Sequence, residues 1–170
     1  MTPSAARRLA RFVVDLGLKN VPAPVVQRTA LLTLDALGCC LAASKYDFAR
    51  AVRATAERLG GPPESALVGS SLRVAAANAA LANATLAHGL DFDDTREDAI
   101  VHTGSVIVTT SLAVAEAAGA PGRAVLEAII AGVEEMCRVG LTVPGTFHAR
   151  HYPPTALAGT FGAVAAARQR

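Results

Sequence analysis

The chain has 170 residues, of which 52% are hydrophobic, only 4% are aromatic and none is tryptophan. The apolar side chains are therefore mainly Ala, Val and Leu, which favours close-packed helices over a β-sandwich, because sheets draw on aromatic and β-branched residues. The formal net charge is only +2, from 16 basic and 14 acidic residues. Nucleic-acid-binding domains usually carry a large excess of basic residues, so we expect no nucleic-acid partner.

Cysteine usage and targeting patterns predict a cytoplasmic chain. The odd number of cysteines argues against a disulfide framework, and Cys39 and Cys40 stand in an apolar run like small core residues. Together with Cys137 they lack the short regular spacings of an iron–sulfur site, so we expect no cofactor. Residues 1–20 lack the apolar core of a secretory signal. The longer apolar stretches are interrupted by Asn, His or Gly, so we expect no membrane-spanning segment.

The first part of the chain predicts three helices. The first begins at Thr2-Pro3, where a capping hydroxyl precedes a proline, and prolines 22 and 24 open the second. Asp47 caps the third, which ends before the breaker run Gly60-Gly61-Pro62-Pro63. These helices are expected over residues 2–17, 22–41 and 47–59.

The second part predicts more helices around two loops. Residues 64–69 are expected as one short strand or an extended link. Helices follow over about 72–88, 103–118, 121–139 and from 155. The acidic segment 91–98 and the segment 140–154, which is rich in Gly, Pro and His, are expected as loops.

The predicted fold class is all-α, a compact domain of about six to seven helices that takes in residues 1–170. Residues 155–168 form an apolar helix that requires burial on nearly all sides. A domain seldom ends just after such a helix, so we expect the chain to be a truncated part of a larger domain.

Polar side chains gather in three places, and these contain all 4 histidines of the chain. The three places are residues 88–98, 102–105 and 148–152.

The first place holds five carboxylates within eight residues. One interpretation is a solvated loop whose aspartates cap neighbouring helices. Another is a magnesium site, because Asp93-Asp94-Thr95-Arg96-Glu97 matches the aspartate-rich pattern of terpenoid synthases and residues 91–94 match that of proton-initiated terpene cyclases. Those enzymes surround a cation with aromatic rings, of which this chain has few, so this remains a remote alternative.

A second chemical interpretation pairs Asp91 with His102. Elimination of water from a hydroxy acid needs a base near the α-carbon, an acid near the hydroxyl, and donors for the carboxylates. A histidine near its normal pKa fills either of the first two roles. The helix that begins at Thr103 and Gly104 offers backbone N–H groups to a carboxylate. The alternative for His102 is a capping or loop residue.

The third place is ambiguous from the sequence. Arg150 is a candidate to bind a carboxylate, because an arginine side chain can donate two parallel hydrogen bonds to it. His148 and His151 are candidates for an acid or a base, or are ordinary surface histidines.

Taken together, these segments resemble the MmgE/PrpD family. The resemblance rests on His88-Gly-Leu-Asp91-Phe-Asp93-Asp94-Thr95, on His102 before an Ala- and Val-rich helix, and on Pro154-Thr-Ala-Leu-Ala-Gly159-Thr160-Phe161-Gly162. Leu34-Asp35-Ala-Leu-Gly38, Gly132-Val-Glu134 and Arg138 fit as well, so the resemblance spans nearly the whole chain. The family includes 2-methylcitrate dehydratase, cis-aconitate decarboxylase and an iminodisuccinate epimerase.

The resemblance implies a large all-helical domain, of which this chain matches only the first part, and a smaller lid domain that is absent here. It implies a site between the two domains that needs no metal, and a homodimer formed through the helical domain. Asp91, Thr95 and His102 match catalytic or substrate-contacting positions. The family's site lysines come later in the chain, so we expect these 170 residues to be inactive alone.

One position departs from the family. The family usually has a histidine six residues before the Gly of its Gly-Thr pair, where this chain has Pro153. Either the loop is rearranged and His151 or Tyr152 takes that role, or the chemistry differs. The departure weakens the expectation of decarboxylase activity in particular.

Two classes of function therefore compete. The first is a lyase similar to 2-methylcitrate dehydratase, acting on a small di- or tricarboxylic acid, with cis-aconitate decarboxylase-like or epimerase chemistry as alternatives within the family. Its expected catalytic residues are Asp91, His102 and His151, and its expected substrate-binding residues are Thr95, Thr103, Gly104, Arg150 and Tyr152. The second is a helical module that catalyses nothing and associates through its apolar surface.

Overall fold

The computed structural model describes residues 3–168 and confirms the all-α class, with eight α-helices, one 3-10 helix and one two-stranded sheet in that range. The elements are α1 (Ala5–Asp15), η1 (Leu18–Asn20), α2 (Ala23–Ala43), α3 (Asp47–Leu59), β1 (Ser65–Ala66), β2 (Arg73–Val74), α4 (Ala76–His88), α5 (Thr103–Ala118), α6 (Gly122–Gly140), α7 (Thr146–Ala149) and α8 (Pro154–Ala166).

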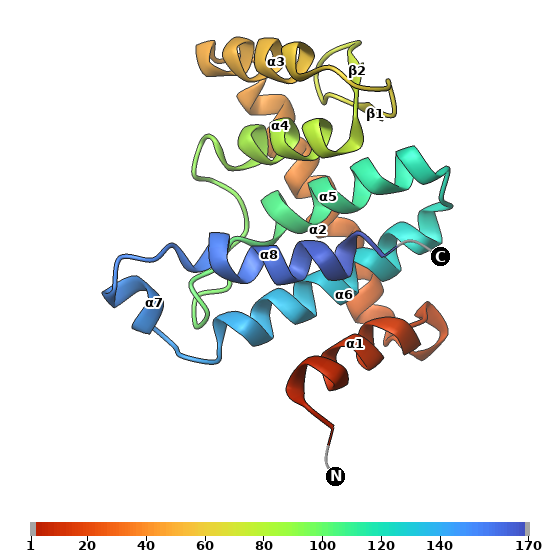
Figure 1. Cartoon of the computed structure of the whole chain (residues 1–170), viewed down its shortest axis with the longest axis vertical. Helices are drawn as coiled ribbons and strands as arrows, with labels where there is room; N and C mark the ends of the chain where they lie inside the picture. The colour runs from red at the N-terminus through yellow and green to blue at the C-terminus, as the bar shows by residue number, and fades with distance from the viewer. Residues whose placement is uncertain (1–2, 169–170) are drawn as a thin grey trace.

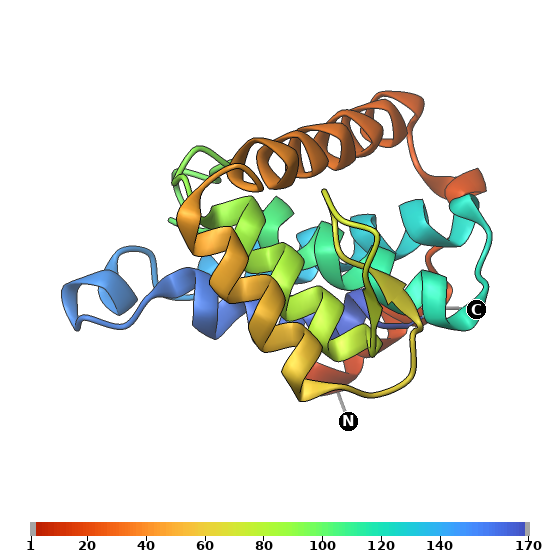
Figure 2. The same cartoon turned by 90° about the horizontal axis from the view of Figure 1, so that it is seen from above.

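Helix α5 is the centre of the domain. It contacts α2, α4, α6 and α8, and Ile107 and Val108 in its N-terminal half are fully buried. In Figure 1, α3, α4, α5 and the pair α6 and α8 follow one another from top to bottom, while α2 runs behind them. Figure 2 shows α2 along one side of this stack and the short helix α7 projecting at one end. The core is therefore arranged around the N-terminal half of α5, whose first residues adjoin the candidate site.

Two glycines allow α6 and α8 to cross closely. A Cβ at Gly132 would lie 2.9 Å from Gly162 O and 2.7 Å from Ile107 Cγ2, and one at Gly162 would lie 2.8 Å from Gly132 O. Real Cβ atoms essentially never approach other heavy atoms this closely. The small residues of the sequence thus set the distance between these helices.

Two helix starts differ from the sequence-based expectation. Helix α1 begins at Ala5, where Ser4 Oγ accepts a hydrogen bond of 3.3 Å from Arg7 N; Thr2 lies outside the described residues. Residues 73 and 74, expected in the fourth helix, instead pair with Ser65 and Ala66 in an antiparallel sheet. This pairing is a tertiary effect, because Ser65 Oγ is anchored by donating a 2.6 Å hydrogen bond to Ala113 O of α5.

The cysteines occupy the positions expected of small core residues. Cys39 and Cys40 are buried, Cys137 is half-buried, and all three are free thiols. Cys40 Sγ donates to Asn83 O of α4 at 3.2 Å. Burial raises the pKa of the Cys40 thiol to about 12, so this thiol stays protonated at neutral pH.

Helix α2 contradicts the expectation that no segment of the chain is long and apolar enough to cross a membrane. By length and composition alone it passes that test, with a mean hydropathy of 1.4 over its most apolar window. It also carries Arg28 and Asp35 and packs against α4, α5 and α6, and the core helices of soluble proteins pass the same test. The helix is therefore weak evidence for a membrane.

We expect Gly162→Ala to lower the free energy of unfolding by about 1–3 kcal/mol, because the added methyl group forces α6 and α8 apart. Gly38→Ala is the matched control. Gly38 lies on an exposed part of α2, and no heavy atom lies within 4 Å of the place that an added methyl group would take. Because alanine favours a helix more than glycine does, this change should raise the free energy of unfolding by up to about 1 kcal/mol. Urea unfolding followed by circular dichroism measures both. Equal effects of the two substitutions would contradict the close crossing.

Candidate active site

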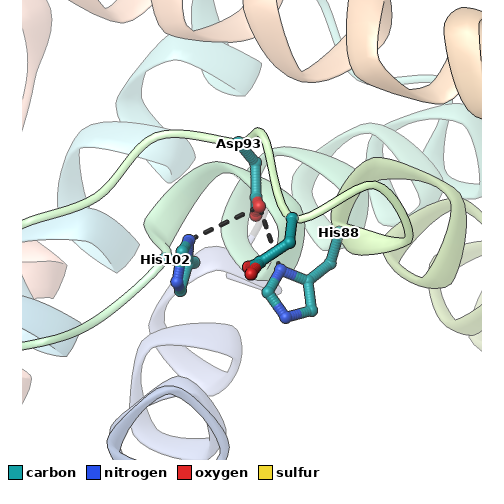
Figure 3. Close-up of side chains that lie close together, drawn as sticks. His88, Asp93 and His102 are labelled. Atoms are coloured by element: carbon teal, nitrogen blue, oxygen red, sulfur yellow. Dashed lines mark hydrogen bonds and ion pairs between the residues drawn. The ribbon is translucent and has the colours of Figure 1, made fainter.

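A carboxylate held between two imidazoles forms the centre of the site. His88 is the last residue of α4, Asp93 lies in the following loop, and His102 immediately precedes α5. His88 Nδ1 lies 2.9 Å and His102 Nδ1 lies 3.4 Å from the same oxygen, Asp93 Oδ1, as Figure 3 shows. The centres of the two imidazole rings are 4.8 Å apart. The tertiary structure thus joins two of the polar places that the sequence separates.

Asp93 is buried, whereas both histidines reach the surface. The Asp93 side chain has no exposed area, and its second oxygen, Oδ2, is buried without a hydrogen-bond partner among the described residues. A buried carboxylate requires donors, and an ionised carboxylate only accepts hydrogen bonds. We therefore assign the proton of each neutral imidazole to Nδ1, which leaves Nε2 of His88 and of His102 with a free electron pair.

The loop between the two histidines is held in a defined shape. Asp91 and Ile100 both adopt positive φ angles, 52° and 53°, which non-glycine residues adopt only when surrounding contacts impose them. Arg96 and Val101 form an antiparallel bridge across the loop, in which Arg96 N donates to Val101 O at 2.9 Å. Arg96 also pairs with Asp98, and the hydrogen bond from its guanidinium lowers the pKa of the Asp98 carboxyl.

Asp94 fastens this loop to the start of α5. Its Oδ2 accepts hydrogen bonds from Thr103 N at 3.2 Å and Thr103 Oγ1 at 2.6 Å, and its Oδ1 accepts from Gly104 N at 2.6 Å. A side chain at position 104 would collide with Asp94 Oδ1, which explains the glycine. The expectation that these backbone N–H groups are free for a substrate carboxylate is therefore wrong: Asp94 already occupies them.

Two threonines contact His102. Thr95 Oγ1 lies 3.3 Å from His102 Nδ1, and substrate binding by Thr95 stays a prediction. Thr155, at the start of α8, accepts a hydrogen bond of 3.1 Å from the backbone N–H of His102. The sequence analysis did not propose Thr155 as a site residue, because no local sequence pattern links it to His102, which lies 53 positions earlier.

Asp91 and His102, which the sequence analysis pairs, lie in one cluster. The carboxylate that pairs with His102, at 3.4 Å between Asp93 Oδ1 and His102 Nδ1, is Asp93, for which the sequence favoured the interpretation of an ordinary loop residue. Asp91 is exposed but belongs to the same cluster: one ligand atom from each of His88, Asp91, Asp93 and His102 lies within 4.8 Å of the others. Asp91 therefore faces the site without being the partner of His102.

Residues 148–152, the third polar place of the sequence analysis, are not part of this cluster. Arg150, His151 and Tyr152 are exposed and follow α7, which projects from the body of the domain in Figure 1. Their backbone hydrogen bonds are local to the segment; Tyr152 N, for example, donates to Phe147 O at 2.9 Å. A catalytic His151 and a substrate-binding Arg150 or Tyr152 therefore remain predictions.

The carboxylates of the aspartate-rich magnesium pattern do not converge on one place, because they have different partners. Asp94 caps α5, Asp98 pairs with Arg96, and Glu97 is exposed outside the cluster around Asp93. Only Asp91 and Asp93 face the same place, and they share it with two imidazoles. This arrangement removes the main support for the terpenoid interpretation.

A cleft of about 590 Å³, a size within the usual range for small-ligand sites, lies beside Thr95 and is not lined by His88, Asp91, Asp93 or His102. Thr95, Asp94 and Thr103 line it together with Arg28 and Asp35, which α2 contributes. Arg28 is exposed and far from the polar places in the sequence, which is why sequence reasoning missed it.

Comparison with known proteins agrees with the resemblance. Residues 7–169 match the sequence profile described as the MmgE/PrpD N-terminal domain. A protein named cis-aconitate decarboxylase-like protein oryM, from Aspergillus oryzae, is 26% identical over 144 residues, which are 81% of this chain and 30% of that protein. A cis-aconitate decarboxylase from Aspergillus terreus is 20% identical over 143 residues, 81% of this chain and 29% of that protein. The chain thus spans less than a third of the length of these relatives.

We expect Asp94→Ala to lower the free energy of unfolding by about 1–2 kcal/mol, because it removes three hydrogen bonds at the start of the central helix. Asp98→Ala, in the same loop but exposed, should change stability little. Thermal unfolding of both variants tests this. A loss for Asp98→Ala as large as that for Asp94→Ala would show that Asp94 does not fasten the loop.

Proposed function

The chain belongs to the MmgE/PrpD family, and from this premise we propose that it forms the helical part of a lyase acting on a small di- or tricarboxylic acid. The observation that carries the proposal is the buried Asp93 carboxylate, which is hydrogen-bonded to the His88 imidazole and lies 3.4 Å from the His102 imidazole. This arrangement fixes the tautomer and orientation of a histidine, as an acid–base catalyst requires.

In the proposed dehydration, neutral His102 removes a proton from the carbon beside a substrate carboxylate. The electron pair of the broken C–H bond forms the C=C bond, and the C–O bond breaks. The hydroxyl leaves as water after it takes a proton from the protonated carboxyl form of Asp91 or from the imidazolium form of His88, which face the same place. Asp93 stabilises the imidazolium that forms on His102, and Thr95 donates a hydrogen bond to the substrate.

Among the described residues, few groups near the site are free to bind a substrate carboxylate. Asp94 occupies the N–H groups of Thr103 and Gly104, so the cation that α2 offers to the cleft beside Thr95 is Arg28. An arginine binds a carboxylate with two parallel hydrogen bonds. We propose that Arg28 and cations from the lid part of the assembled enzyme hold the substrate, and that the chain is inactive without them.

Dehydration and decarboxylation both move a proton at a substrate carbon. The names of the relatives favour decarboxylation as the alternative reaction, whereas Pro153 stands where the family usually has a histidine. We therefore propose a hydro-lyase similar to 2-methylcitrate dehydratase first, with decarboxylation and epimerisation as alternatives. The expected compartment is the cytoplasm.

The exposed apolar side chains support association, which the non-catalytic alternative also requires. Leu31, Leu34 and Leu41 on α2 are each more than half exposed, and Phe161 and Val164 on α8 are as well. Burial of such a surface is favourable in proportion to its area. We propose that the chain forms a homodimer that covers part of this surface.

For the lyase, we expect His102→Ala, introduced into the native gene, to lower the turnover of 2-methylcitrate or cis-aconitate by about 10²- to 10⁴-fold, because it removes the proton-transfer group. Ultraviolet absorbance follows alkene formation, and CO₂ release distinguishes decarboxylation. His148→Ala, outside the cluster, is the control and should keep full activity. An unchanged rate in His102→Ala would overturn this mechanism.

For the dimer, we expect light scattering of the purified chain to give twice its 17.4 kDa mass. Leu34→Glu places a charge on the α2 surface and should yield monomers, whereas Leu59→Glu, at the exposed end of α3, should not. A monomeric unmodified chain would contradict the proposal.

A further inference from the structure

Helix α2 has one long exposed face that is mainly apolar. Exposed residues recur at every third or fourth position along this helix, which places them on one side of it. They are Gln27, Arg28, Leu31, Leu34, Asp35, Gly38 and Leu41. The three leucines are 53%, 68% and 52% exposed, and Figure 2 shows α2 at the outer edge of the helix stack. The other side of α2 packs against α4, α5 and α6, so this face lacks a partner within the described part of the chain.

Arg28 and Asp35 are the only charged residues of α2. Neither side chain has a hydrogen bond or an ion pair among residues 3–168. The two residues lie two helical turns apart, about 10 Å along the axis, with Leu31 and Leu34 between them. A surface that carries one unpaired cation and one unpaired anion is complementary in charge to a second copy of itself.

A second copy of the chain satisfies both charges at once if its α2 runs antiparallel. Arg28 and Asp35 are equally far from the midpoint between residues 31 and 32. A two-fold axis at this midpoint places Arg28 of each protomer beside Asp35 of the partner subunit. The same axis brings the exposed Leu31 side chains of the two protomers together, so apolar area is buried between the ion pairs. A parallel arrangement would instead place Arg28 against Arg28.

We propose that two copies of this chain associate through antiparallel α2 helices, with two reciprocal ion pairs between Arg28 and Asp35. This inference rests on the homodimer of the proposed function and adds its surface and register. It also gives the partner a role beside the site. Arg28 lines the cleft beside Thr95, and a guanidinium has five N–H donors. Asp35 of the partner subunit orients Arg28 through some of these donors and leaves others for a substrate carboxylate.

The test is reversal of each charge, with the dissociation constant of the dimer measured by analytical ultracentrifugation. Asp35→Arg places arginine against arginine, and Arg28→Asp places aspartate against aspartate, twice in each dimer. We expect each variant to raise the dissociation constant by more than about 10-fold, because two attractive pairs become two repulsive ones. Asp15→Arg and Arg11→Asp make the same charge changes at exposed positions of α1 and should leave the constant unchanged. Circular dichroism checks that all four variants are folded.

Mixing the two α2 variants tests the register itself. An Asp35→Arg chain and an Arg28→Asp chain restore both ion pairs to each other, so an equimolar mixture should form heterodimers that native mass spectrometry detects. A monomeric unmodified chain would overturn both this inference and the proposed dimer. A dimer that withstands the charge reversals, or variants that dissociate and are not rescued by mixing, would overturn the antiparallel register and leave the proposed dimer standing.

Discussion

The inward direction of two adjacent carboxylates sets the geometry of the whole site. Asp93 turns toward His88 and His102, while Asp94 turns toward Thr103 and Gly104 at the start of α5. Because α5 is the central helix of the domain, the three hydrogen bonds to Asp94 tie an irregular loop to the most buried part of the fold. A loop fastened in this way holds catalytic groups more accurately than a free one.

Close helix packing extends this control to α8. The glycines at the crossing of α6 and α8 let the two helices lie close, and α8 also packs against α5. Thr155 in its first turn accepts the backbone N–H of His102. The Ala- and Gly-rich composition is therefore linked to function, because larger side chains at the crossing would move α8 and with it a contact to the proposed base.

Burial of the Asp93 carboxylate supports the proposed chemistry. In the lyase, it orients the imidazoles and stabilises the charge that develops on His102. The surface position of His88 and Asp91 leaves the cluster open to a substrate.

The sequence by itself determined the all-α class, the family and the order of the long helices, because helical periodicity, proline and glycine positions are local signals. By resemblance it also proposed Thr95 as a substrate-binding residue and His102 as a catalytic residue. Only the tertiary structure decided that Asp93 Oδ1 lies 3.4 Å from His102 Nδ1, and that Asp94 occupies the start of α5. It also decided that residues 73 and 74 pair as a strand, that Thr155 contacts His102, and that Arg28 lines the cleft beside Thr95. These features depend on side-chain directions and on contacts between distant segments, which a one-dimensional pattern does not contain.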